Sequence, residues 1–279
     1  MPEHPRQERS RVLVVLGTRP EAIKMAPVLD ALRRREELVE TRLALTGQHD
    51  ELVDQVLGAF GLEPEYDLEI MKAGQDLYDL AHGCLEGLKG VVKDFRPQMI
   101  LVQGDTASVF YGTLVAFFEG LGVGHVEAGL RSGNKWAPFP EEMFRRLADV
   151  LTDVHFAPTF EARDNLLREG IAPDRIHVTG NTVVDALLSV AGQEREARNP
   201  VLRGLLAEER SLVLLTAHRR ESFGEPIREV FRAVRQLAEG EEGVEILYPV
   251  HPNPQVTGPA HEILADHPRI HLTAPLDYL

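Results

Sequence analysis

Three carboxylates stand where predicted strands end or a predicted helix begins. Asp105 follows an apolar run at Met99–Val102, Glu127 directly follows a second run at Val123–Val126, and Glu141 opens a predicted helix. Short apolar runs between turn signals are typical of buried parallel strands, and open α/β sheets bind ligands beyond the carboxyl ends of their strands. One alternative is that Asp105 caps a helix and the other two acids are solvated. Three acids at successive ends favour a functional site at this edge.

A strand-to-helix junction near the N-terminus has the features of an anion site. The segment GTRPE, residues 17–21, follows an apolar run and has the spacing of a capping box, with proline in the first turn. Free N–H groups at a helix start favour an anion, and Arg19 and Lys24 add positive charge. The chain has no G-x-G-x-x-G or G-x-x-x-x-G-K-[ST] motif, so neither a dinucleotide site nor a P-loop is indicated.

Eleven histidines raise the question of a metal site. None lies in an H-E-x-x-H arrangement or pairs with cysteines at zinc spacing, so no metal is predicted. His218 is different because it follows a predicted strand and precedes two arginines, the first of which is Arg219. A structural role and a functional role for His218 are both open on position alone.

Predicted strands and helices alternate along the whole chain, which indicates an α/β fold with parallel sheets. Strands are predicted at residues 12–16, 42–45, 99–102, 123–126, 154–156, 176–179, 212–216, 244–250 and 270–272. Helices are predicted after residue 20 and at about 50–60, 76–94, 141–150, 159–168, 182–190, 226–237 and 261–265. The first unit thus has about six or seven strands, but the second has three.

A polar connection separates the two predicted units. Residues 191–200 read AGQEREARNP, and the boundary is expected between Gly180 and Pro200. We therefore predict an N-terminal domain at residues 1–180 and a partial C-terminal domain at residues 181–279.

Composition restricts the class of protein. The net charge of −14 argues against nucleic-acid binding, which needs a basic face. The single cysteine, Cys84, excludes a disulfide within the chain and favours a reducing compartment. The N-terminus has no apolar stretch typical of a secretory signal, and no run approaches the length of a membrane span. The expectation is a cytoplasmic protein that binds neither nucleic acid nor membrane.

Seven motifs occur in an order that is similar to one enzyme family. They are GTRPEAIKMAPV (17–28), GDT (104–106), GHVEAGLRS (124–132), PFPEE with Arg145, TGNTVVDAL (179–187), TAHRRESFGEP (216–226) and YPVHPNP (248–254). Together they resemble the non-hydrolysing UDP-N-acetylglucosamine 2-epimerases over nearly the whole chain. The resemblance implies two Rossmann-like domains of glycosyltransferase-B architecture, a homodimer, and no added cofactor. It also implies interconversion of UDP-N-acetylglucosamine (UDP-GlcNAc) and UDP-N-acetylmannosamine (UDP-ManNAc) for surface polysaccharide synthesis.

The resemblance also assigns roles to individual residues. The family reaction eliminates UDP to give a 2-acetamidoglucal, then re-adds UDP after protonation of the opposite face of C2. The residues that match catalytic positions are Asp105, Glu127, Glu141 and His218, and those that match anion-holding positions are Arg19, Lys24, Arg145 and Arg219. Which carboxylate acts on which face of C2 stays open.

Some family members bind a second UDP-GlcNAc as an activator. Gln48 and His251 match polar positions of that activator site, as does Arg219. Glu51 and Gly74 stand where activated members carry Gln and Arg, so weak or absent activation is expected.

The sequence departs from the family pattern at two places. Phe144 stands where Asn is usual, which removes an amide beside the expected sugar site. The UDP-binding segment D-S-G-G-x-x-E-E of the family does not occur, so the second domain is expected to be incomplete and this chain to have little or no epimerase activity. The alternatives are an inactive nucleotide-sugar-binding homologue and a glycosyltransferase of the same architecture. The HRRE and VEAGLR strings argue against the glycosyltransferase.

Overall fold

The computed structural model divides the chain into two compact units, Met1–Gly192 and Gln193–Leu279. The residues that it describes are 9–47, 51–72, 74–192, 196–219 and 222–276. The division falls inside the predicted boundary stretch but later than the predicted domain start at residue 181. It does so because helix α7 (Val183–Ala191) packs against helix α1 (Arg19–Arg33) and therefore belongs to unit 1.

Unit 1 is built on a parallel sheet of seven strands, as the alternating pattern predicted. The strands are β1 (Ser10–Leu16), β2 (Val39–Leu45), β3 (Tyr66–Asp67), β4 (Met99–Gln103), β5 (Gly122–Val126), β6 (Val154–Ala157) and β7 (Ile176–Val178). Their order is β3-β2-β1-β4-β5-β6-β7, so the direction of strand addition reverses between β1 and β4. Such a reversal opens a crevice above the carboxyl ends of the two central strands.

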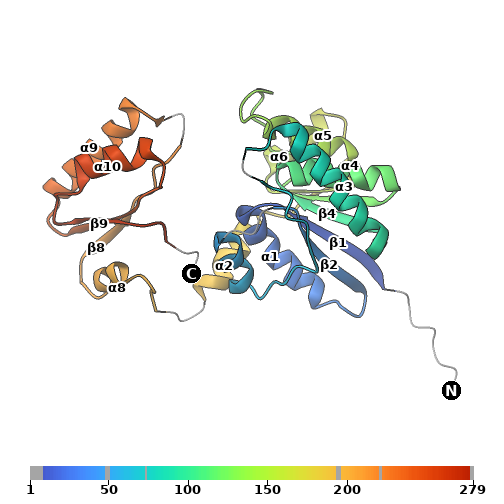
Figure 1. Cartoon of the computed structure of the whole chain (residues 1–279), viewed down its shortest axis with the longest axis horizontal. Helices are drawn as coiled ribbons and strands as arrows, with labels where there is room; N and C mark the ends of the chain where they lie inside the picture. The colour runs from blue at the N-terminus through green and yellow to red at the C-terminus, as the bar shows by residue number, and fades with distance from the viewer. Residues whose placement is uncertain (1–8, 48–50, 73, 193–195, 220–221, 277–279) are drawn as a thin grey trace, which may run out of the picture. The chain divides into compact units, whose positions relative to one another are not determined.

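Helices cover both faces of this sheet (Figure 1). They are α1, α2 (Glu51–Ala59), α3 (Leu77–Phe95), α4 (Ala107–Glu119), α5 (Glu141–Leu151), α6 (Phe160–Arg168) and α7. Parallel connections are right-handed, so a reversal of strand order places helices on opposite faces. Helix α1 lies on one face, and α3, α4 and α5 pack together on the other.

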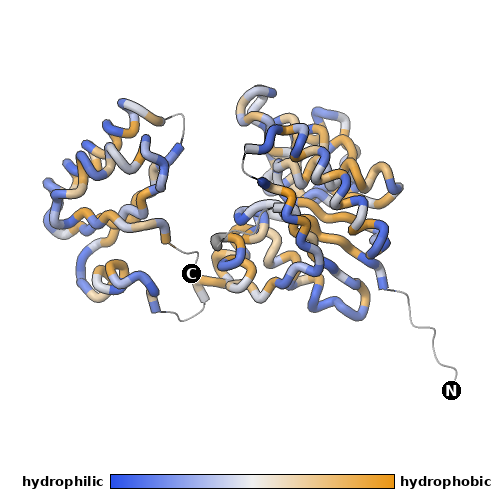
Figure 2. The backbone as a smooth tube through the Cα atoms, viewed as in Figure 1, coloured by the Kyte–Doolittle hydropathy of each residue, from blue (hydrophilic) through white to orange (hydrophobic). Residues whose placement is uncertain are grey.

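The central strands are mostly apolar, as expected for strands covered on both faces. Leu13 and Val15 of β1 point into the core beneath α3 and α4, together with Ile100 and Val102 of β4. Val14 of β1 is also fully buried. Its side chain points to the opposite face of the sheet from Leu13 and Val15, because successive side chains of a strand alternate between the two faces. Figure 2 shows this apolar centre with polar residues gathered on the outer helix faces.

Unit 2 contains a smaller parallel sheet, ordered β10-β9-β8. Its elements are α8 (Pro200–Leu206), β8 (Ser211–Leu214), α9 (Glu225–Gly240), β9 (Val244–Pro249), α10 (Pro254–Leu264) and β10 (Ile270–Thr273). Helices α9 and α10 pack together over the sheet, around the buried rings of Phe231 and Tyr248. The three strands agree with the predicted number.

Several local predictions differ from the structure, and helix α4 (Ala107–Glu119) was given no predicted range. The two-residue strand β3 and the short helix α8 were not predicted, because both are too brief for a periodic pattern. Helix α10 begins at Pro254, whereas the helix was predicted only from His261. Pro254 occupies the first helical turn, where it is tolerated, and Asn253 caps the helix by accepting the N–H of Gln255 at 2.9 Å.

Within the described ranges, no helix has the length and apolarity needed to cross a membrane.

Candidate active site

Asp105 and Glu127 lie at the same edge of the unit 1 sheet. Asp105 follows β4, Glu127 follows β5, and the last residues of these strands pair in register as Gln103 and Val126. The Gly104 N–H donates to the Val126 carbonyl at 3.1 Å and ties the two turns together. The prediction that these two acids open on one edge is therefore confirmed in position.

Glu127 is held from three sides. Lys24 of α1 donates to both of its carboxylate oxygens, at 2.8 and 2.6 Å, and Asn181 donates to Oε1 at 2.8 Å. The Gln103 side chain donates to Oε2 as well. The Glu127 backbone has a φ of +66°, which is rare for a residue with a side chain and occurs where the surroundings impose it. The carboxylate is thus fixed in orientation and only 10% exposed.

The negative charges of Glu127 and Glu141 both act on Asp105. Burial raises the pKa of Asp105, the nearby cation Arg145 lowers it, and the charges of Glu141 and Glu127 raise it again. The net direction is upward, and Arg145 donates to Oδ2 at 3.1 Å. A carboxyl group whose pKa moves toward neutrality is suited to proton exchange at physiological pH.

Helix α5 carries Glu141 and Arg145 toward this cluster. Glu142, which the sequence analysis did not single out, accepts from Arg145 at 2.8 and 2.5 Å and from the Ser132 N–H at 3.0 Å. These bonds orient the Arg145 guanidinium toward Asp105. The side chain of Glu142 is fully buried, so its role is to hold Arg145 and the loop before α5.

Phe144 fills the space beside Glu141 with an aromatic ring. It stacks on Phe110 of α4 with ring centres 5.4 Å apart and meets Tyr111 edge-on. Both Phe144 and Glu141 line a cavity of about 220 Å³ together with the helix-start residues Thr18 and Thr106. The departure at position 144 therefore makes one wall of this cavity apolar.

Glu21 joins the turn after β1 to the turn after β4. It accepts the Gly17 and Thr18 N–H groups and the Thr106 hydroxyl, so the predicted capping spacing closes the start of α1. Burial raises its pKa to about 7, although all three hydrogen bonds act to lower it. Gly17 must lack a side chain here, because a Cβ would lie 2.0 Å from the Ser108 hydroxyl.

Arg19, the first residue of α1, is partly exposed at this same edge. Among the described residues its side chain has no hydrogen bond or ion pair. Its role in holding an anion at the helix start stays a prediction.

The remaining predicted residues lie elsewhere. His218 and Arg219 follow β8 in unit 2, where the His218 ring stacks on His251 with centres 5.4 Å apart and planes 8° apart. Both histidines are exposed beyond the carboxyl ends of neighbouring strands. Their approach to the carboxylates of unit 1 stays a prediction, and Gln48 lies outside the described residues.

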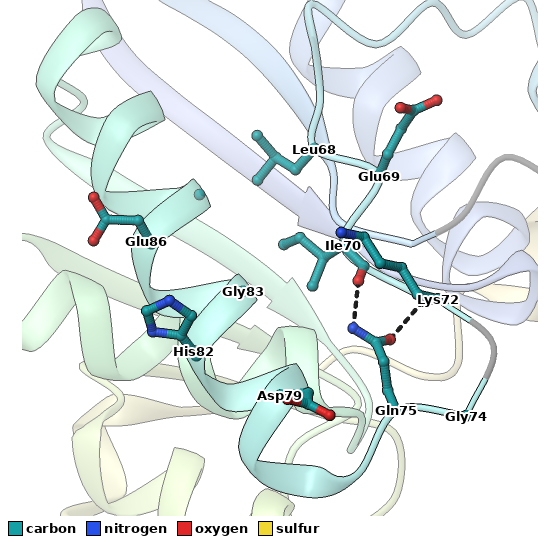
Figure 3. Close-up of a pocket in the computed structure, with 11 residues that line it drawn as sticks. Leu68, Glu69, Ile70, Lys72, Gly74, Gln75, Asp79, His82, Gly83 and Glu86 are labelled. Atoms are coloured by element: carbon teal, nitrogen blue, oxygen red, sulfur yellow. Dashed lines mark hydrogen bonds between the residues drawn. The ribbon is translucent and has the colours of Figure 1, made fainter.

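A larger cavity of about 620 Å³ lies away from these acids, between α3 and the segment after β3 (Figure 3). Gln75 closes one side by donating to the Ile70 carbonyl at 2.7 Å and accepting the Lys72 N–H at 2.6 Å. Gly74, the position where activated family members carry Arg, is on its rim. None of the described residues predicted for catalysis or substrate binding lines it.

Sequence reasoning missed several residues that support the site. Gln103, Glu142, Asn181, His125 and Asp149 all contact the loops that carry the acids. One signal was present, because His125 is a polar residue inside an otherwise apolar buried strand and such a residue needs a hydrogen-bond partner. The other partners come from distant segments, which local patterns do not reveal.

Comparison with known proteins gives one consistent result. A family model described as UDP-N-acetylglucosamine 2-epimerase matches residues 30–279. A Bacillus subtilis (strain 168) protein named UDP-N-acetylglucosamine 2-epimerase is 44% identical over 272 residues, covering 98% of this chain and 70% of the relative. A Salmonella typhimurium protein of the same name is 45% identical over 276 residues, covering 96% and 73%.

A solved structure shows the same likeness in three dimensions. The UDP-GlcNAc 2-epimerase from Neisseria meningitidis, bound to UDP-GlcNAc, superposes with a TM-score of 0.85 at 39% identity. The match covers 96% of this chain and 73% of that one. Sequence and fold therefore point to one family.

Proposed function

Since this chain belongs to the UDP-N-acetylglucosamine 2-epimerase family, we propose that it interconverts UDP-GlcNAc and UDP-ManNAc. The observation that carries the proposal is the cluster of Asp105, Glu127 and Glu141 at one sheet edge, with Lys24 and Arg145 between them. The glycosyltransferase-B architecture of the family accounts for the two α/β units. The position of the acids beside a strand-order reversal is where such sheets bind nucleotides.

The chemistry requires acids and bases on two faces of one carbon. The C2 proton is not next to a carbonyl, so its removal must accompany departure of UDP from C1. A carboxylate takes the C2 proton, the C–H electrons form a C1=C2 double bond, and the C1–O bond electrons leave with UDP. In the second half, an acid protonates the other face of C2 and UDP returns to C1. General acid–base catalysis of this kind contributes about 10²–10⁴-fold to the rate.

The geometry of unit 1 fits these demands. Glu127 is held by a lysine and two amides, whereas Asp105, which is 33% exposed, has Arg145 as its one side-chain partner among the residues that the structure describes. The two groups come from different strands and have different partners, so they can meet different faces of a sugar ring. Arg19 at the start of α1 would hold part of the diphosphate, and His218 with Arg219 would supply further contacts from unit 2.

The inactive-homologue alternative has less support. Every acid that the resemblance assigns is present, and the acids lie together in the folded unit. The chain spans 70–73% of the length of the relatives compared, and those relatives carry the epimerase name.

The test follows both sugars in heavy water. The protein is incubated with UDP-GlcNAc in D₂O and the products are observed by proton NMR. We expect UDP-ManNAc signals to grow while the C2 proton signal of both nucleotide sugars disappears, because the exchanged proton comes from solvent. Recovery of unchanged, fully protonated UDP-GlcNAc would contradict the proposal, and a reaction without protein supplies the control.

We also propose that two copies of the chain form a dimer through unit 1. Phe117 and Phe118 at the end of α4 are 62% and 65% exposed, and Val150 at the end of the adjacent α5 is 73% exposed. Neighbouring apolar side chains of this size are typical of protein interfaces.

The dimer has its own test. We expect Phe117→Glu combined with Phe118→Glu to shift the protein from dimer to monomer in sedimentation equilibrium. Phe160→Glu, at an equally exposed ring on α6, should leave the dimer intact. A monomeric unmodified protein would exclude the interface.

A cytoplasmic location and a role in surface polysaccharide synthesis complete the proposal. A free thiol at Cys84 is compatible with a reducing compartment. Cell fractionation would locate the protein. Loss of N-acetylmannosamine-derived surface sugars on deletion of the gene would support the polysaccharide role, and an unchanged surface would oppose it.

A further inference from the structure

Two fully buried ionisable groups lie behind the site and have no part in the proposed chemistry. His125 of β5 is 0% exposed and Asp149 of α5 is 1% exposed. The His125 Nδ1 is 2.7 Å from Asp149 Oδ1, and its Nε2 is 2.7 Å from the Gly104 carbonyl oxygen. A buried pair of this kind is costly to desolvate, so its contacts need an explanation.

The contacts define the charge of the pair. A carbonyl oxygen only accepts, so the His125 Nε2 must donate to Gly104. The second oxygen of Asp149 accepts from the Gly129 N–H at 3.2 Å and from Arg131 at 2.7 Å, as an ionised carboxylate does. One proton lies between His125 Nδ1 and Asp149 Oδ1, which are 2.7 Å apart, so the pair as a whole is neutral.

The electrostatic surroundings support this assignment. Burial by itself would lower the pKa of His125, but the charge and hydrogen bond of Asp149 and the bond to Gly104 raise it overall. Burial would raise the pKa of Asp149, and the charges of His125 and Arg131 lower it overall. The other groups that face the pair are His155, 4.0 Å from Asp149 Oδ1, and Glu169, which binds Arg131 at 2.7 Å.

The pair touches both turns that carry the acids. Gly104, whose carbonyl accepts a hydrogen bond from the His125 Nε2, directly precedes Asp105 and has a φ of +86°. Gly129, whose N–H binds Asp149, lies two residues after Glu127. A shift of the His125 ring or of the Asp149 carboxylate would therefore move the backbone next to a proposed catalytic acid.

We propose that His125 and Asp149 are positioning residues that hold the Asp105 turn and the Glu127 turn in register for catalysis. The inference rests on the proposed epimerase function. His125 acts on Asp105 through the Gly104 carbonyl, and Asp149 acts on the Glu127 turn through the Gly129 N–H. Neither side chain touches the substrate.

Two substitutions at one position separate positioning from stability. The amide nitrogen of asparagine reaches the place of a histidine Nδ1, and that of glutamine reaches the place of Nε2. His125→Asn keeps a donor to Asp149 and loses the Gly104 bond. His125→Gln keeps the Gly104 bond and leaves Asp149 without its main partner, which should make it the less stable variant.

Activity and stability should then rank the variants in opposite orders. We expect kcat to fall about 100-fold in His125→Asn with little change in KM, because displacement of a catalytic group by about 1 Å costs that much. His125→Gln should lose under about 10-fold while unfolding at lower urea concentration. His155→Gln, at the buried histidine that pairs with His125 on β6, is the control and should keep kcat.

Two further measurements do not depend on turnover. Hydrogen exchange of the amides at 104–106 should accelerate in His125→Asn but not in His155→Gln. Nitrogen-15 NMR of the unmodified protein should show a proton on the Nε2 of His125 at neutral pH, because that nitrogen donates to the Gly104 carbonyl.

The outcomes are decisive in either direction. If kcat follows the urea midpoint across the three variants, or if the His125 Nε2 is unprotonated, the positioning role is overturned. An unmodified protein that shows the NMR signature and exchange pattern without turnover would count against the proposed function alone.

Discussion

Asp105→Asn is expected to lower kcat for epimerisation about 1,000-fold, a loss of about 4 kcal/mol of transition-state stabilisation. An amide has nearly the same shape as the carboxylate and can still accept from Arg145, which donates to Asp105 at 3.1 Å. It cannot gain and lose a proton at C2. Glu127→Gln should have an effect of the same size, because Lys24, Gln103 and Asn181 hold that group in one orientation.

A carboxylate at the opposite end of the sheet is the matched control. Asp153 accepts the Val123 N–H at 2.9 Å, at the amino end of β5. Asp153→Asn should alter stability slightly and leave kcat unchanged. The readouts are initial rates and deuterium entry at C2, and retained deuterium exchange in Asp105→Asn would remove that residue from the proton-transfer step.

Gly129→Ala is expected to destabilise the protein by about 2–5 kcal/mol. Gly129 has a φ of +86°, where a side chain costs about 1–2 kcal/mol. An added Cβ would also lie 2.3 Å from the Ala162 carbonyl oxygen and 2.9 Å from Leu166 Cγ, and such overpacking costs about 1–3 kcal/mol. Because domains are stable by only about 5–15 kcal/mol, this change should leave unit 1 marginally folded.

Gly133→Ala separates the two costs. Gly133 lies in the same loop with a φ of +76°, but an added Cβ would meet no atom within 4 Å. Its substitution should therefore cost only about 1–2 kcal/mol. Urea unfolding followed by circular dichroism measures both variants, and equal losses would show that the clash with Ala162 is relieved by movement of α6.

The candidate acids could be predicted because their positions depend on local features. Asp105 and Glu127 each follow an apolar run, and carboxyl ends of neighbouring parallel strands necessarily share an edge. Glu141 starts a helix after a proline-rich loop and lies beside the same edge. The family motifs added the expected roles, which the mutations above test.

The supporting contacts could not be predicted, since they join segments far apart in the chain. Lys24 and Glu127 are separated by 103 residues, and Asn181 reaches Glu127 across 54 residues. The raised pKa of Glu21 depends on complete burial, which the capping pattern alone does not imply.

The sequence by itself determined the α/β class, the three strands of unit 2 and the edge at which Asp105 and Glu127 lie. Alternating apolar runs and helix signals carry that information locally, and parallel connections leave few arrangements. Only the tertiary structure decided that His125 contacts both Asp149 and the Gly104 carbonyl, that Asp149 accepts the Gly129 N–H, and that Phe144 lines a cavity. These properties arise from burial and from partners distant in sequence, and a side chain's charge and orientation depend on what surrounds it after folding.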